Sequence, residues 1–180
     1  MVFRPTLRTA RLTLRPHILA DFPAMCTMYS DPLFLRFVNA PPQTGEEVWN
    51  RLLRYMGHWA AFDRGLFAIV ENDTGEFVGE TGFANFHREI SPDFDPFPEA
   101  AWALKSSAQG KGYAREAVRV AHAWFDKVYS ERTVCIIDGA NAPSQKIAAE
   151  LGYRPFGVAG YKGKDVRMYQ RTAVSKGSSK

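Results

Sequence analysis

The sequence predicts a single mixed α/β domain with a mostly antiparallel sheet. Apolar runs of strand length are joined by turn residues such as Asn72–Gly75, and they alternate with segments whose apolar residues recur every three or four positions. The 180 residues, 46% of them hydrophobic, suffice for one domain with a substantial core. We expect this domain to span residues 1–175 and the small, polar end at 176–180 to be disordered.

The first part of the chain is expected to form a strand and then two helices. Pro16 ends a run of alternating apolar and polar residues, which is typical of a strand. Asp31-Pro32 ends a helical pattern, because a residue before proline avoids helical backbone angles. Thr44 and Glu47 have the spacing of a capping box. The predicted elements are a strand at 11–15, a helix at 20–30 and a helix that begins after Thr44.

The rest of the chain is expected to combine strands and helices. The segment His87–Pro98 contains three prolines and is expected to be a loop. Glycine at 152 is a typical residue after the end of a helix. The predicted elements are strands at Gly65–Glu71, Phe77–Phe86, Glu99–Leu104 and Arg132–Ile137, helices near 113–128 and at Ser144–Leu151, and a closing hairpin of Tyr153–Tyr161 and Val166–Thr172.

Two glycines, Gly110 and Gly112, lie between the strand Glu99–Leu104 and the long helical pattern that ends at Val128. The first backbone N–H groups of a helix lack internal partners and carry the positive end of the helix dipole, so this loop suits an anion. The loop is not a P-loop, because Lys111 is not followed by serine or threonine, and it lacks the glycine pattern of a dinucleotide fold. A plain turn between strand and helix is the alternative.

Two motifs in order resemble those of the GNAT N-acetyltransferase superfamily. The run Gln109–Ala114 resembles the acyl-CoA pyrophosphate loop, (Gln/Arg)-x-x-Gly-x-(Gly/Ala). Asn141-x-x-Ser144, followed by Leu151-Gly-Tyr, resembles the branch that acetylates ribosomal-protein N-termini (RimJ/RimL-like). The resemblance covers about residues 7–172. It implies a GNAT fold with helices on both faces of the sheet, in which the strands at 99–104 and 132–137 are parallel and splay apart to hold the cofactor.

The resemblance also implies an acetyl-CoA-dependent N-acetyltransferase. In the family, backbone N–H groups of the loop hold the pyrophosphate, a strand pairs with the pantetheine arm, and the asparagine side chain contacts pantetheine. Lysines near the phosphates would add positive charge, although a solvated lysine is as good an interpretation. The implied cofactor-binding residues are Ala103, Leu104, Gln109, Gly110, Lys111, Gly112, Tyr113, Ala114, Asn141 and Lys146.

Attack of an amine on a thioester needs an acceptor for the amine proton and a donor for the departing thiolate. Glu99 and Glu80, on neighbouring predicted strands, are the candidate bases, and either of them could instead be structural. Many family members protonate the thiolate with a tyrosine, but Ala148 stands at the matching position. Ser144 is therefore the candidate donor, with helix capping as the alternative for both Asn141 and Ser144.

Net charge limits the kinds of partner that the protein is expected to bind, and hydropathy limits the cellular compartment in which it is expected. A net charge of +4 is compatible with an anionic ligand and with weak ribosome association. The N-terminus lacks the apolar stretch of a signal peptide and no run is long enough to cross a membrane, so we expect a cytoplasmic protein. Histidines and cysteines lack metal-ligand spacing, so no metal is expected, and His122 is expected on the polar face of its helix.

The sequence leaves the amine acceptor open between a protein N-terminus and a small molecule. It also leaves open whether the protein is a monomer or a homodimer. Two other functions remain possible from the residues: a non-catalytic acyl-CoA-binding regulatory module, because the tyrosine is missing, and an RNA- or ribosome-associated basic protein.

Overall fold

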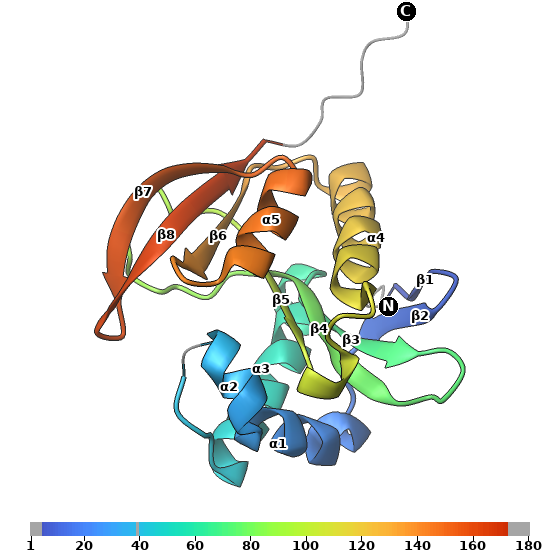
Figure 1. The fold of residues 1–180 in the computed structure, drawn as a ribbon. Coiled ribbons are helices and arrows are strands. Elements are labelled where there is room, and N and C mark those ends of the chain that lie inside the picture. The colour runs from blue at the N-terminus through green and yellow to red at the C-terminus, as the bar shows by residue number, and fades with distance from the viewer. Residues whose placement is uncertain (1–4, 39, 173–180) are drawn as a thin grey trace, which may run out of the picture. The chain divides into compact units, whose positions relative to one another are not determined.

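The computed structural model describes residues 5–38 and 40–172 (Figure 1). The chain divides into two compact units: unit 1 comprises Met1–Ala84 and Ala101–Val120, and unit 2 comprises Asn85–Ala100 and Ala121–Lys180. The strands form an eight-stranded sheet of order β1-β2-β3-β4-β5-β6-β8-β7. One domain over residues 1–175 stays a prediction, and the expected tail at 176–180 lies outside the described residues.

Unit 1 contains the predicted N-terminal strand, helices and hairpin. Thr44 caps α3, accepting from the Glu47 N–H while the Glu47 carboxylate accepts from the Thr44 N–H, so the capping box is confirmed. Pro32 begins a further helix that the sequence analysis missed, because proline also favours the first turn of a helix. The elements are β1 Leu7–Arg8, β2 Leu12–Pro16, the 3-10 turn Leu19–Asp21, α1 Phe22–Ser30, α2 Pro32–Val38, α3 Gly45–Phe62, β3 Leu66–Glu71 and β4 Phe77–Ala84.

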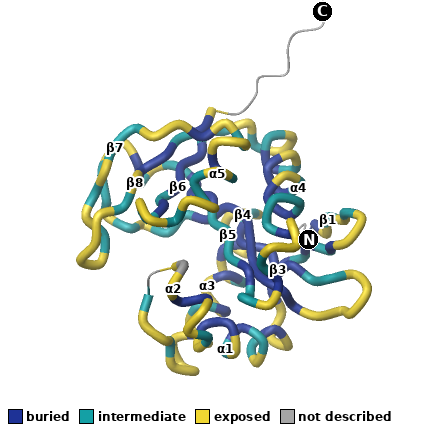
Figure 2. The backbone as a smooth tube through the Cα atoms, viewed as in Figure 1, coloured by how far each residue is buried: buried dark blue, intermediate teal, exposed yellow. Residues whose placement is uncertain are grey.

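The core of unit 1 lies between its strands and helices. Strands β2, β3 and β4 are antiparallel, with Leu14 opposite Ile69 and Ile69 opposite Gly79. Every residue of β4 is buried, which Figure 2 shows as an unbroken dark strand. Trp59 on α3 is fully buried and donates its indole N–H to the Leu66 carbonyl at 3.0 Å. Helix α3 is thereby fixed to the start of β3.

Two elements run from one unit into the other: β5, Glu99–Leu104, and α4, Tyr113–Val128. In unit 2, Glu99 pairs with Val134 in a parallel register, whereas β6–β8 and β7–β8 are antiparallel. A mostly antiparallel sheet with a parallel pair is therefore confirmed, while the splaying of that pair stays a prediction. The other elements of unit 2 are β6 Thr133–Asp138, α5 Ala142–Glu150, β7 Arg154–Tyr161 and β8 Lys164–Arg171.

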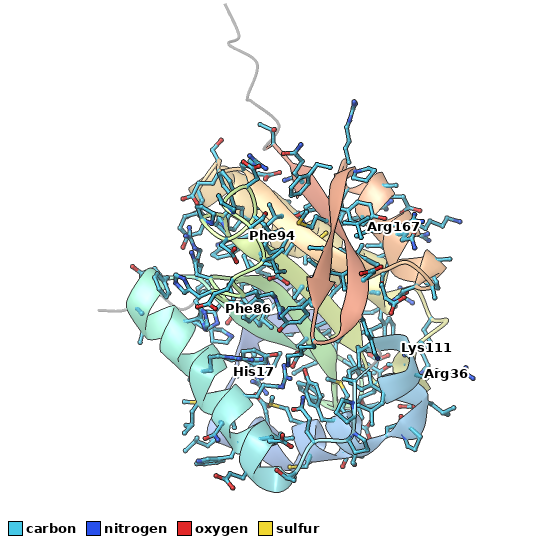
Figure 3. The ribbon with its side chains drawn as sticks, turned by 90° about the vertical axis from the view of Figure 1, so that its left-hand side faces the viewer. His17, Arg36, Phe86, Phe94, Lys111 and Arg167 are labelled. Atoms are coloured by element: carbon cyan, nitrogen blue, oxygen red, sulfur yellow. The ribbon has the colours of Figure 1, made fainter. Side chains whose placement is uncertain are left out.

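The loop before β5 is packed into the core of unit 2. Its Phe94, labelled in Figure 3, is buried and packs with Val134 and Met168. His122 corrects an expectation: it is 3% exposed, not on a polar face, and its Nε2 lies 3.1 Å from the Tyr153 hydroxyl. That hydroxyl also lies 2.8 Å from Thr133 Oγ1. Burial raises the pKa of Tyr153 well above its usual value, so its hydroxyl is neutral and can both donate and accept a hydrogen bond.

Candidate active site

The glycine loop occupies the start of α4, as the sequence predicts. Gly110 and Gly112 have φ angles of 76° and 81°, in the left-handed region that favours glycine. The first helical hydrogen bond of α4 runs from the Glu116 N–H to the Gly112 carbonyl at 3.2 Å. The first backbone N–H groups of a helix precede its helical bonding pattern and carry the positive end of its dipole, so the start of α4 suits an anion.

The two ends of this loop are tied to unit 1. Gln109 donates its side-chain amide to the Leu104 carbonyl at 3.3 Å, which closes the loop on the end of β5. Tyr113 is buried and donates its hydroxyl to Glu71, which raises the pKa of the tyrosine and lowers that of the glutamate. Lys111 is exposed, and Figure 3 labels its place in the loop. These two hydrogen bonds fix the ends of the loop, and the backbone between them and the side chain of Lys111 are left to face a ligand.

The C-terminal end of β5 lies close against β4. Ala103 is half-buried and Leu104 is 9% exposed. Gly79 allows this approach, because a Cβ built there would lie 2.3 Å from the Ala103 carbonyl oxygen. The Lys105 N–H donates to the Val78 carbonyl at 2.9 Å, so pairing continues past the end of β5.

Glu80 lies in a buried polar cluster of unit 1. Its Oε1 accepts from the hydroxyls of Tyr29 on α1, at 2.5 Å, and Tyr55 on α3, at 2.8 Å. Its Oε2 is buried and accepts no hydrogen bond from the residues that the structure describes. Arg51 donates to the Tyr55 hydroxyl at 2.9 Å and lies 4.3 Å over the Tyr29 ring. One carboxylate oxygen is therefore fixed by two neutral donors, and the other keeps its lone pairs.

Burial and the nearby carboxylate set the ionisation of these neighbours. Burial, and then the charge of Glu80, raise the pKa values of Tyr29 and Tyr55, so both are neutral at ordinary pH. His17, labelled in Figure 3, is 1% exposed. The centre of its ring lies 5.1 Å from that of the Tyr55 ring. Burial lowers its pKa, although the charges of Glu80 and Asp21 oppose this. The histidine is therefore neutral at ordinary pH.

Glu99 lies in a different environment, at the start of β5 in unit 2. Arg88, from the loop before β5, donates Nε to Glu99 Oε2 at 2.5 Å and Nη2 to Oε1 at 2.9 Å. The same guanidinium donates to the Tyr161 hydroxyl at 2.6 Å. Burial lowers the pKa of Arg88, but the charge and hydrogen bonds of Glu99 outweigh it and the net pKa is raised. Both oxygens of Glu99 are thus held by a permanent cation.

The asparagine motif lies at the start of α5. Helix α5 begins at Ala142, two residues before the predicted start, and Asn141 is its N-cap, accepting from the Ser144 N–H at 3.1 Å. Ser144 lies in the first turn and is not the capping residue, so capping as the explanation for Ser144 is wrong. Ser144 is half-buried, Lys146 is exposed and Ala148 is fully buried.

Sequence reasoning missed the partners of both glutamates. Tyr29 lies in the predicted helix at 20–30 and Tyr55 in the helix that begins after Thr44, and a tyrosine hydroxyl on each of two helices is a usable signal for a buried acceptor. Arg88 gives no such signal in the sequence, because it lies in a predicted loop without apolar periodicity that would indicate which way its side chain points. Within residues 5–38 and 40–172, no cluster of three or more His, Cys, Asp or Glu side chains could hold a metal, and no helix is long and apolar enough to cross a membrane.

Comparison with known proteins identifies the family. An uncharacterised N-acetyltransferase, p20, from Bacillus licheniformis is 27% identical over 85% of this chain and 84% of that protein. A GnaT-family acetyltransferase from Bordetella pertussis is 33% identical, with a TM-score of 0.83 over 93% of this chain and 99% of that chain.

A ribosomal-protein-S5-alanine acetyltransferase from Vibrio fischeri shares the fold, with 20% identity and a TM-score of 0.73 over 95% of this chain and 98% of that chain. The family model of the acetyltransferase (GNAT) domain matches residues 11–154. That span includes the glycine loop, both glutamates and the asparagine motif. The chain belongs to the GNAT acetyltransferase family.

Proposed function

We propose that the protein is an N-acetyltransferase that moves the acetyl group of acetyl-CoA to a primary amine by direct attack on the thioester. The main support for this proposal is the loop at the start of α4. Its Gly110 and Gly112 have left-handed backbone angles, and the chain belongs to the GNAT family. A side chain at either position would strain the backbone and stand between a phosphate and the helix N–H groups.

The proposed contacts with the cofactor come from the loop before α4, from the end of β5 and from the start of α5. Backbone N–H groups of residues 110–114 take the pyrophosphate, with the exposed Lys111 adding charge, and Gln109 holds the loop to β5. Ala103 and Leu104 pair with the pantetheine arm through their backbone. Asn141 is proposed to contact pantetheine, and Lys146 to contribute positive charge, as the family resemblance implies.

Glu80 is the proposed proton acceptor. Its Oε2 has lone pairs that no described residue occupies, whereas both oxygens of Glu99 accept from Arg88. The amine nitrogen bonds to the thioester carbon as its proton passes to Glu80, directly or through water, and the carbon–sulfur bond then breaks. Ser144 donates a hydrogen bond to the departing thiolate. Catalysis by Glu99 stays a prediction, which the turnover of a Glu99→Gln variant tests.

The acceptor is proposed to be a primary amine, on a protein N-terminus or a small molecule. The Vibrio fischeri protein is named for a ribosomal-protein alanine, and its shared fold supports testing N-terminal peptides first. The net charge of +4 is compatible with weak ribosome association. A cytoplasmic location is proposed from the lack of an apolar signal stretch in the sequence. We expect a monomer or homodimer.

The test combines binding with turnover. Calorimetry should give a measurable CoA affinity for the parent and none for Gly110→Val or Gly112→Val, measured at a temperature where both variants are folded, since strain at positive φ should lower their melting temperatures. Release of free CoA thiol should then depend on one class of amine in a panel of N-terminal peptides, amino acids and polyamines. CoA binding without turnover on any amine would favour a non-catalytic module, and unchanged affinity in both glycine variants would refute the anion site.

A further inference from the structure

Arg11, just before β2, reaches the glycine loop across 100 residues of sequence. Its Nη1 donates to the Lys111 carbonyl at 2.9 Å, and its Nε and Nη2 donate to Glu116 Oε2 at 2.8 and 2.5 Å. The guanidinium also lies 4.7 Å from the centre of the Tyr113 ring. The side chain is 48% exposed, so hydrophobic burial does not explain its fixed direction.

Glu116 is built to hold this arginine. It lies in the first turn of α4, and its Oε1 accepts from Thr9 Oγ1 at 2.5 Å and from the Arg11 N–H at 3.2 Å. Partial burial raises its pKa, but these hydrogen bonds and the Arg11 charge outweigh burial and the net pKa is lowered. The carboxylate is therefore ionised at neutral pH, and it orients the guanidinium toward the loop.

The contact with Lys111 acts on the next residue through the geometry of the peptide bond. The carbonyl of Lys111 and the N–H of Gly112 belong to the same planar trans peptide group and point in opposite directions. A hydrogen bond that fixes the carbonyl thus fixes the direction of the N–H. Gly112 has a φ of 81° and is free to rotate as only glycine is, so its N–H direction needs such a constraint.

We propose that Arg11 is a positioning residue for the cofactor: supported by Glu116, it holds the Lys111 carbonyl so that the Gly112 N–H is aimed at the pyrophosphate of acetyl-CoA. The inference rests on the proposed function. It assigns Arg11 no contact with the reacting atoms, so its effect is confined to affinity for molecules that contain the pyrophosphate.

The chain offers a matched control in Arg15, on β2. Arg15 also makes two hydrogen bonds to one carboxylate, from Nη1 and Nη2 to Asp21 at 2.8 and 2.7 Å, but it makes no bond to the loop among those that the structure describes. Arg15→Gln therefore reports what the loss of an arginine–carboxylate pair does to the fold alone.

The experiment measures dissociation constants for CoA and for pantetheine, which lacks the pyrophosphate, together with melting temperatures. Arg11→Gln and Glu116→Gln should each weaken CoA about tenfold, the effect of one lost hydrogen bond to a charged group, and leave pantetheine unchanged. Arg11→Lys should restore part of the affinity, and Arg15→Gln should lower the melting temperature with CoA affinity within twofold.

Failure of this inference differs from failure of the proposed function. A parent protein that binds no CoA would refute the proposed function. A parent that binds CoA, with Arg11→Gln binding it equally well, would overturn the role of Arg11. Equal weakening of CoA and pantetheine in Arg11→Gln would also overturn it, because the effect would then be a general loss of structure.

Discussion

Glu80 in unit 1 and Glu99 in unit 2 are both strand residues that are 4% exposed, but their hydrogen-bond partners differ. Glu80 accepts from two neutral tyrosine hydroxyls through one oxygen. Glu99 receives a guanidinium on both oxygens. A carboxylate that must take up a proton needs a lone pair that no other group occupies, whereas a carboxylate that neutralises a buried cation must keep its charge. Burial alone therefore does not distinguish a base from a structural glutamate, and the partners do.

The largest expected effect is on turnover when Glu80 is changed. Glu80→Gln should lower kcat/KM for the acceptor amine by roughly 10²–10⁴, the usual contribution of a general base. The buried amide NH₂ that replaces Oε2 lacks an acceptor, so a stability loss of about 1–3 kcal/mol is expected as well. Rates are compared per folded protein, and a parent-like rate would exclude Glu80 as the base.

Glu99→Gln should have the opposite effect, with a large loss of stability and little loss of turnover. Removing the carboxylate leaves Arg88 without its counter-charge, and loss of one partner of a buried pair costs about 3–5 kcal/mol. The 20% exposure of the Arg88 side chain makes the lower end the better expectation. Denaturant unfolding should show this loss with kcat nearly unchanged, and Arg88→Met added to Glu99→Gln should recover part of it. A hundredfold fall in kcat at parental stability would instead make Glu99 the base.

Ser144→Ala extends the comparison to a second polar residue of unit 2. Because Asn141, not Ser144, caps α5, the substitution should cost less stability than the loss of the cap in Asn141→Ala. If the hydroxyl stabilises the thiolate only in the transition state, kcat and kcat/KM should fall alike, about tenfold or more. Asn141→Ala is the stability comparator and should lose about 1 kcal/mol. Normal kinetics in Ser144→Ala would leave the departing thiolate without a donor from this motif.

The sequence predicted those features that local signals determine. The bounds of β5, the start of α4, the capping box of α3 and the closing hairpin follow from apolar periodicity, glycines and capping residues a few positions apart. Helix α2 was missed, because Pro32 is equally suited to end one helix and to begin the next. The contacts of both glutamates and of Arg11 join residues 11–105 positions apart, and no local pattern specifies such pairs.

The smallest effect expected concerns acid. Asp21 in unit 1 is paired like Glu99, with both oxygens accepting from the Arg15 guanidinium. Burial raises its pKa, but Arg15 and the Ile18 N–H outweigh burial and the net pKa is lowered in the folded state. The unfolded chain then binds more protons below about pH 4, the ordinary pKa of aspartate, so this stabilisation is present above that pH and is lost as pH falls through the folded pKa. Denaturant unfolding between pH 3 and 6 should show a shallower pH dependence for Asp21→Asn than for the parent. Identical slopes would mean that pairing with a guanidinium does not make a carboxylate of this protein acid-sensitive, and the contrast drawn between Glu80 and Glu99 would lose its electrostatic basis.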